Sequence, residues 1–126
     1  MVRALRRTAC VAIASALLAG PAFASGDAAK GKDVFNRCAM CHSDAKGAGN
    51  RIGPDLWGVV GRKAGTEPGF NYSSALKSSG IVWTPDKLEQ WVMGPGKMVP
   101  GTRMMFAGLS SKQQAEDLVA FLGTLK

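Results

Sequence analysis

The chain has 126 residues, of which 46% are hydrophobic, 7% aromatic and 20% charged, with a formal net charge of +7. This length suffices for one small globular domain and excludes a large enzyme with a separate cofactor domain. One histidine and three cysteines restrict the metal and redox chemistry that the chain can support.

The first 24 residues have the pattern of a secretory signal peptide. Three arginines within the first seven residues precede the uncharged, mostly apolar stretch 8–20, and the small residues Ala22 and Ala24 suit cleavage after Ala24. An uncleaved membrane anchor is the alternative, but 13 apolar-rich residues are fewer than the ~20 that span a bilayer as a helix. We therefore expect residues 1–24 to be removed on export, and residues 25–126 to form one domain in the periplasm.

Removal of this segment changes the charge and the cysteine count. Losing the three arginines lowers the formal net charge from +7 to +4, and losing Cys10 leaves two cysteines in a mature chain of 102 residues. No cluster of lysine and arginine of the nucleic-acid-binding kind remains. We expect no nucleic-acid partner.

Two helices are expected in the first part of the mature chain. Residues 27–39 favour the first, in which Gly31 would let another helix approach closely. Residues 43–69 are rich in Gly, Lys and Pro without a sustained period, which predicts a long loop, and loops of this length are uncommon unless they are functional. Residues 74–79 favour a short second helix that ends at Gly80.

Two further helices are expected after Gly80. Thr84 as N-cap, followed by a proline and an acidic residue, begins a helix that ends at 94–95. A second loop covers 94–109, and the last helix begins at Ser110 or Ser111. Its apolar residues recur with helical spacing at Leu118, Phe121, Leu122 and Leu125. No segment alternates convincingly as a strand, so the sequence predicts a small all-α domain.

The loop content of this domain raises an energetic question. Ordering a backbone costs about 1–2 kcal/mol per residue, whereas three or four short helices bury only a modest core. We therefore expect a further group to fill the centre.

Residues 38–42, Cys-Ala-Met-Cys-His, have the C-x-x-C-H pattern of covalent c-type haem attachment. Two thiols three residues apart on a helical turn face the same side and can reach two vinyl groups on adjacent pyrroles. His42 follows directly and can coordinate the iron from one face. We expect one haem c, attached through Cys38 and Cys41.

Three other interpretations of this motif stay open. A structural zinc site needs four ligands, whereas the mature chain offers Cys38, Cys41 and His42 as conventional soft ligands. A thioredoxin-like dithiol would begin a helix after a strand, in a βαβ pattern that the sequence lacks. A plain disulfide between the two cysteines is compatible with an oxidising compartment.

The single histidine limits the second axial ligand of the iron. If His42 takes one axial position, bis-histidine ligation within one chain is excluded. A methionine, a lysine, water or an open position remains. The methionines that could reach the other face are Met93, Met98, Met104 and Met105.

Five further segments follow the C-x-x-C-H motif in order along the chain. They are Gly53-Pro54-Asp55-Leu56-Trp57-Gly58, Gly61-Arg62-Lys63, Pro68-Gly69-Phe70 with Tyr72, Trp83, and Pro100-Gly101-Thr102-Arg103-Met104. Together with the motif they resemble the small soluble class I cytochromes c, of the mitochondrial type and its bacterial relatives. The resemblance implies a fold in which N- and C-terminal helices cross, while short helices and long loops wrap around one covalent haem.

The resemblance also implies the iron ligands. It matches His42 to the proximal ligand, Met104 to the distal ligand, and Pro54 to a proline whose carbonyl accepts a hydrogen bond from the proximal imidazole. Such an acceptor would fix the tautomer of the ring. Gly31 and Phe35 are matched to residues that pack against the last helix.

Three more residues are matched to groups that hydrogen-bond a haem propionate, namely Arg62, Tyr72 and Trp83. A surface role for Arg62 and Tyr72, and a plain core role for Trp83, are the alternatives. Two departures affect the polar network of the pocket. Trp91 stands where the family often has a tyrosine, and Leu76 where the mitochondrial type often has an asparagine.

The function implied is one-electron transfer, without enzymatic activity, by a monomer. Closed ligation by His42 and Met104 leaves no place for a substrate. The resemblance implies partners such as a quinol–cytochrome c reductase, a terminal oxidase or a photosynthetic reaction centre, and a periplasmic dehydrogenase could donate instead. Arg37, Lys97 and Arg103 would form a basic rim that attracts acidic partner surfaces.

Two other function classes stay open. A small haem peroxidase would need a distal histidine as acid and base, and the chain has one histidine in all. A gas or redox sensor would need a second domain or a partner surface. A weak far-red Met–iron charge-transfer band, which the resemblance implies, would distinguish the carrier from both.

Overall fold

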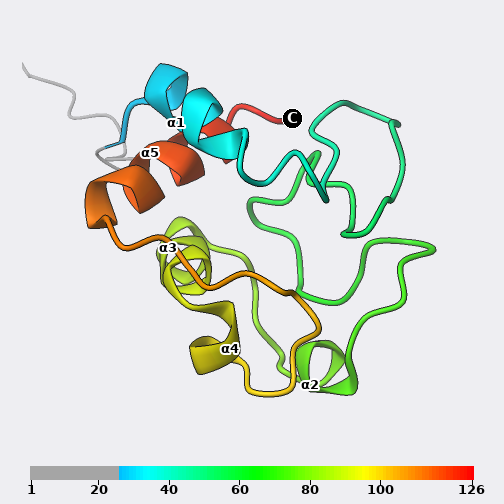
Figure 1. Cartoon of the computed structure of the whole chain (residues 1–126). Helices are drawn as coiled ribbons and strands as arrows, with labels where there is room; N and C mark the ends of the chain where they lie inside the picture. The colour runs from blue at the N-terminus through cyan, green and yellow to red at the C-terminus, as the bar shows by residue number, and fades with distance from the viewer. Residues whose placement is uncertain (1–25) are drawn as a thin grey trace, which may run out of the picture.

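The structure is a computed structural model that describes residues 26–126; the predicted signal peptide lies outside the described residues. Within residues 26–126, five helices follow one another, and Lys63 and Val82 form an isolated antiparallel bridge. The helices are α1 (Ala28–Phe35), α2 (Ser74–Lys77), α3 (Pro85–Met93), α4 (Pro95–Met98) and α5 (Lys112–Leu122). None of the described helices is long and apolar enough to cross a membrane. The expected all-α class is confirmed (Figure 1).

Helix α1 is shorter than the predicted helix over 27–39. The Asp27 side chain caps it by accepting hydrogen bonds from the N–H groups of Ala29 and Lys30, at 2.9 and 3.2 Å. After Phe35 the hydrogen bonds change to a three-residue spacing, and the Cys38 N–H donates to the Phe35 carbonyl at 2.7 Å. Cys38, which the prediction placed inside the first helix, therefore lies in a tighter turn beyond the end of α1.

Helix α3 begins and ends as predicted, but α4 was missed. The Thr84 side chain accepts a hydrogen bond from the Lys87 N–H at 3.3 Å, and Pro85 occupies the first turn. The predicted loop over 94–109 contains α4, because Gly94 (φ −179°, ψ 79°) redirects the chain and Pro95 then starts a new turn with a φ already suited to a helix.

The predicted start of the last helix is confirmed. The Ser111 side chain caps α5 by accepting a hydrogen bond from the Gln114 N–H at 3.2 Å. The short α2 is capped in the same way by Ser73, and the chain turns away at Gly80, whose φ is +70°. That φ favours glycine over residues with a side chain.

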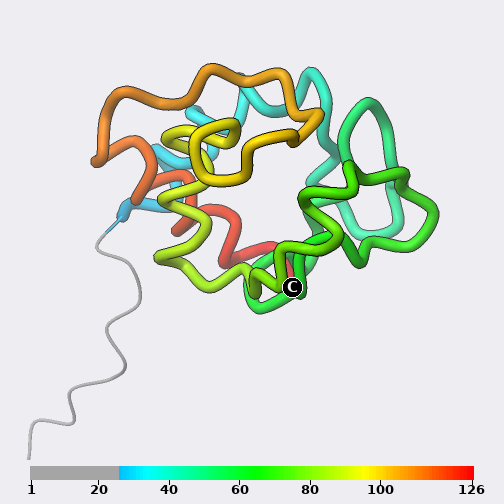
Figure 2. The backbone as a smooth tube through the Cα atoms, turned by 90° about the horizontal axis from the view of Figure 1, so that it is seen from below, coloured from blue at the N-terminus to red at the C-terminus, as the bar shows by residue number. Residues whose placement is uncertain are grey.

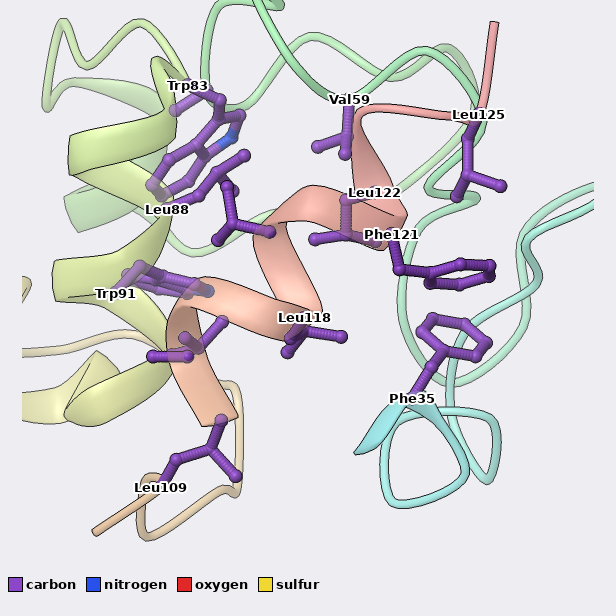
Figure 3. Close-up of a cluster of buried hydrophobic side chains, with 14 of the residues drawn as sticks. Phe35, Val59, Trp83, Leu88, Trp91, Leu109, Leu118, Phe121, Leu122 and Leu125 are labelled. Carbon is purple, nitrogen blue, oxygen red and sulfur yellow. The ribbon is translucent and has the colours of Figure 1, made fainter. Parts of the chain in front are cut away.

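Helices α1 and α5 lie against each other, as Figure 1 shows. A Cβ atom added at Gly31 would overlap the backbone carbonyl of Asp117, so the glycine permits the close crossing that the sequence predicted. One turn further on, the rings of Phe35 and Phe121 pack with centroids 5.3 Å apart (Figure 3). The Asp27 N–H donates to the Asp117 carboxylate at 2.8 Å, which ties the start of α1 to the middle of α5.

The other face of α5 packs on α3. Leu88 and Trp91 of α3 lie toward Leu118 and Leu122 of α5 in the buried cluster of Figure 3. Trp91, one of the two expected departures, packs its ring 5.1 Å from that of Trp83. Burial of these rings fixes one wall of the central space, around which the long loops wind (Figure 2).

Candidate functional site

A cavity of about 510 Å³ lies among the loops and helices. Most of its wall is apolar, with contributions from Leu76 of α2, Leu88 of α3 and Leu118 of α5. Every residue predicted for the site lies on its lining: Cys38, Cys41, His42, Pro54, Arg62, Tyr72, Trp83 and Met104. The lining therefore combines sulfur and imidazole donors with a large apolar wall, which suits an apolar metal-bearing group such as haem.

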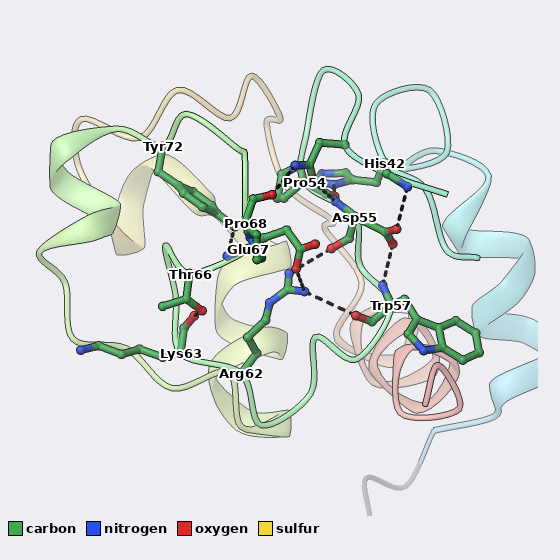
Figure 4. A network of polar contacts seen from close by, with 12 residues as sticks. His42, Pro54, Asp55, Trp57, Arg62, Lys63, Thr66, Glu67, Pro68 and Tyr72 are labelled. Atoms are coloured by element: carbon green, nitrogen blue, oxygen red, sulfur yellow. Dashed lines mark hydrogen bonds and ion pairs between the residues drawn. The ribbon is translucent and has the colours of Figure 1, made fainter. Parts of the chain in front are cut away.

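The imidazole of His42 is buried and oriented. Its Nδ1 lies 2.7 Å from the Pro54 carbonyl oxygen (Figure 4). A carbonyl only accepts, so Nδ1 carries the proton and Nε2 keeps its lone pair. Burial lowers the pKa of His42, although the bond to Pro54 opposes this. The ring is therefore held neutral, with one nitrogen ready to bind a metal.

Gly53 lets the backbone pass close to this ring. A Cβ atom at this position would come within 2.7 Å of Nδ1 and 2.8 Å of Nε2 of His42. A larger residue would push the imidazole out of its bond with Pro54, which explains the Gly-Pro pair at 53–54.

The two thiols are half-buried on the cavity wall, and no disulfide joins them. Burial raises the pKa of Cys38, with the nearby Arg37 charge acting in the opposite direction. No group of three or more His, Cys, Asp and Glu side chains within 26–126 is arranged to hold a metal ion.

An arginine that the sequence analysis did not single out braces the cysteine turn. Arg51 donates from Nη1 to the Ala39 carbonyl at 2.8 Å and from Nη2 to the Met40 carbonyl at 3.4 Å. These are the two residues between the cysteines. Backbone carbonyls leave no signature in a sequence, so no pattern pointed to this contact.

Burial and position distinguish the four candidate methionine ligands. Met93 and Met98 lie outside the cavity lining, whereas Met104 and Met105 are both on it. Met105 is 98% exposed, and Met104 is half-buried. Exposure alternates from residue to residue over 102–106, as expected when neighbouring side chains of an extended segment face opposite sides. Met104 is thus the one that faces inward.

Two of the residues predicted to hold a propionate, Arg62 and Tyr72, both contact Glu67. Arg62 Nη1 lies 2.8 Å from Glu67 Oε2, and Nη2 donates to the Asp55 carbonyl at 3.0 Å. The Glu67 N–H donates to the Tyr72 hydroxyl at 3.1 Å (Figure 4). Burial raises the pKa of Tyr72. The sequence analysis did not identify Glu67, because a pair five residues apart in a loop follows no period.

The mouth of the cavity carries part of the predicted basic rim. Arg37 and Arg103 are exposed and lie on the lining, whereas Lys97, on α4, is exposed but lies outside it. The Arg37 guanidinium lies 5.6 Å from the centroid of the Phe106 ring, and Arg103 donates to the Tyr72 carbonyl at 2.9 Å. Two of the three residues predicted for the basic rim, Arg37 and Arg103, therefore lie on the cavity lining, and each is held by a contact with the protein.

Comparisons with known proteins bear on this site. A family model described as Cytochrome c matches residues 28–126. Cytochrome c2 of Rhodopila globiformis is 51% identical over 102 residues, covering 80% of this chain and 95% of that protein. Cytochrome c of Euglena viridis is 47% identical over 102 residues, covering 80% of this chain and 99% of that protein.

Solved structures give the same result. Cytochrome cH from Methylobacterium extorquens has a TM-score of 0.75 and 45% identity, covering 79% of this chain and 99% of that one. Cytochrome c2 from Rhodospirillum centenum has a TM-score of 0.77 and 35% identity, covering 80% and 99%. Both likenesses extend over nearly the whole of the described chain.

Proposed function

The chain belongs to the cytochrome c family and carries one covalently bound haem c, and from this we propose that it is a periplasmic one-electron carrier. One observation supports the proposal above all. A single cavity brings together the two thiols of a C-x-x-C turn, a neutral imidazole and an inward-facing thioether.

In this proposal each donor has one task. Cys38 and Cys41 would hold the porphyrin by thioether bonds, while His42 Nε2 and the Met104 sulfur would bind the iron. When bound, haem c supplies an iron that takes up and releases one electron. The Pro54 carbonyl keeps the His42 lone pair directed at the cavity. A thioether ligand stabilises the ferrous state, so Met104 would raise the reduction potential.

The cavity wall would support this task in two ways. Its apolar side chains exclude water and disfavour the extra charge of the ferric state, which also raises the potential. Because His42 and Met104 would both bind the iron and the chain has no second histidine to act as acid and base, we infer a carrier and not an enzyme.

The surface at the cavity mouth supports transfer to another protein. Met40 and Ile52, which lie on the lining, are 74% and 77% exposed, and Arg37 and Arg103 flank the same mouth. An apolar centre with cations beside it suits brief contact with acidic redox proteins. We propose a quinol–cytochrome c reductase or a periplasmic dehydrogenase as donor, and a terminal oxidase or photosynthetic reaction centre as acceptor.

The periplasmic location depends on the pattern of residues 1–24 and on the bacterial cytochromes c2 among the relatives. Cleavage after Ala24 and export of residues 25–126 belong to this proposal.

The test is to express the full chain in a host that matures c-type cytochromes. We expect the protein in the periplasmic fraction, without residues 1–24 by mass, with haem that stays on the polypeptide in acidified acetone. A redox titration should follow a one-electron curve, and Cys38→Ala with Cys41→Ala should lose the covalent haem. Cytoplasmic retention would refute the location, and haem that is extractable from the unmodified chain would refute the site.

A further inference from the structure

The charges around the cavity are not equivalent. Three arginines lie on its lining, namely Arg37, Arg62 and Arg103. Among residues 26–126, Arg62 is the one of these three that forms an ion pair with a carboxylate. Arg103 donates to backbone carbonyls, and Arg37 lies over an aromatic ring. The positive charge of Arg62 is therefore the one that the protein itself offsets.

The partner of Arg62 is held in place. The Nη1 atom of Arg62 lies 2.8 Å from Oε2 of Glu67, and the side chains of Arg62 and Glu67 are only 16% and 23% exposed. The Glu67 backbone N–H is bonded to the Tyr72 hydroxyl, so the residue is fixed at both ends (Figure 4). A charge pair that is partly removed from water is screened less by solvent and salt than an exposed pair.

The hydrogen bonds of Arg62 limit what it can still offer to the cavity. Nη1 donates to Glu67 and to the Trp57 carbonyl, and Nη2 donates to the Asp55 carbonyl. A guanidinium has five N–H donors, so two remain for an acidic group of a bound haem. Glu67 is not on the cavity lining, whereas Arg62 is. The charge of Glu67 therefore affects the cavity by offsetting the charge of Arg62.

We propose that Glu67 is a positioning residue that sets the reduction potential by offsetting the charge of Arg62. Reduction adds one electron to the site, so a fixed negative charge nearby makes reduction less favourable and a fixed positive charge makes it more favourable. Beside the Glu67 carboxylate, Arg62 orients a bound acidic group while its positive charge is partly offset. This inference rests on the proposed function, because it concerns the potential of the bound haem.

The decisive variant is Glu67→Gln in the haem-bearing protein. The glutamine oxygen still accepts a hydrogen bond from Arg62, so the change removes the charge and keeps the acceptor. Glu89→Gln is the matched control, because Glu89 is likewise half-buried and ionisable but lies on α3, outside the cavity lining. Glu67→Asp keeps the charge, and Glu67→Ala removes it without an amide.

The measurement is the midpoint potential at pH 7 and low ionic strength, by spectroelectrochemical titration. We expect Glu67→Gln and Glu67→Ala to raise the potential, with a shift at least three times that of Glu89→Gln, and Glu67→Asp to stay nearer to the unmodified protein. A shift no larger than that of Glu89→Gln would overturn the inference, as would a shift in Glu67→Asp as large as that in Glu67→Gln. An unmodified chain without covalent haem would instead overturn the proposed function itself.

Discussion

Replacing Gly31 with alanine tests whether the crossing of α1 and α5 depends on the missing side chain. The added Cβ would overlap the carbonyl group of Asp117 and lie 2.8 Å from the Cβ of Phe121. The carbonyl belongs to the backbone of α5, so relief requires the two helices to separate. Overpacking of this kind costs about 1–3 kcal/mol.

Two terms decide the net effect. Alanine gains about 0.5–1 kcal/mol over glycine inside a helix, which offsets part of the strain. Because the overlap is with rigid backbone, we expect the strain to exceed the gain, with a net loss of roughly 1–2 kcal/mol. With a urea slope of about 2 kcal/mol per M for a small domain, the unfolding midpoint should fall by about 0.5–1 M.

The assay is urea unfolding of the haem-bearing protein, followed by far-ultraviolet circular dichroism. Gly96→Ala in α4 is the control, since a Cβ there has no atom within 4 Å and the residue lies in a helix. It should leave the midpoint unchanged or raise it slightly. If Gly31→Ala were as stable as the control at an unchanged slope, the close crossing would not depend on the glycine, and the argument from the overlap would be wrong.

Three further outcomes are expected. Met104→Ala should abolish the far-red Met–iron band, lower the potential and admit cyanide, whereas Met105→Ala should keep the band, because Met105 is 98% exposed; the reverse pattern would refute the ligand assignment. Charge reversal at Arg37 should slow association with an acidic redox partner, measured by stopped flow, more than charge reversal at Lys126, and the difference should shrink as salt is added. Equal effects at the two sites would mean that the basic rim does not attract the partner. Hydrogen bonds, first of all the one from the Asp27 N–H, hold the pKa of the Asp117 carboxyl below its usual value. The ionised carboxylate therefore stabilises the folded state above the usual pKa, and this stabilisation is lost as the pH falls through the folded-state pKa. Asp117→Asn should therefore be less stable than the unmodified protein at pH 7, with urea midpoints that converge below about pH 4, and a gap that stayed constant would refute this.

Local signals in the sequence predicted the helix starts well. Thr84 and Ser111 cap α3 and α5 because an N-cap is a contact between residues two or three apart. The end of α1 was placed four residues too late. Its hydrogen bonds tighten after Phe35, where the chain turns to bring the cysteines to the cavity, and that turn depends on the tertiary fold.

The sequence predicted that the proposed haem-binding residues would lie together, and it did not predict the contacts that support them. Cys38, Cys41 and His42 form a motif whose spacing carries its chemistry, and all three line the cavity. Arg51 acts on backbone carbonyls, and Glu67 meets Arg62 across an irregular loop. Contacts of this kind depend on loop conformation, which no periodicity encodes.

The bond between the Asp27 N–H and the Asp117 carboxylate spans 90 positions of the chain. Closing a loop of that length costs about 4 kcal/mol of chain entropy before any contact compensates it. The crossing of α1 and α5 is thus a contact of very high sequence separation, of the kind that slows folding. During synthesis, α1 has no partner until α5 has emerged. A chain that lacks α5 would leave Phe35 and the face around Gly31 uncovered, so the two ends of the domain become ordered together or not at all.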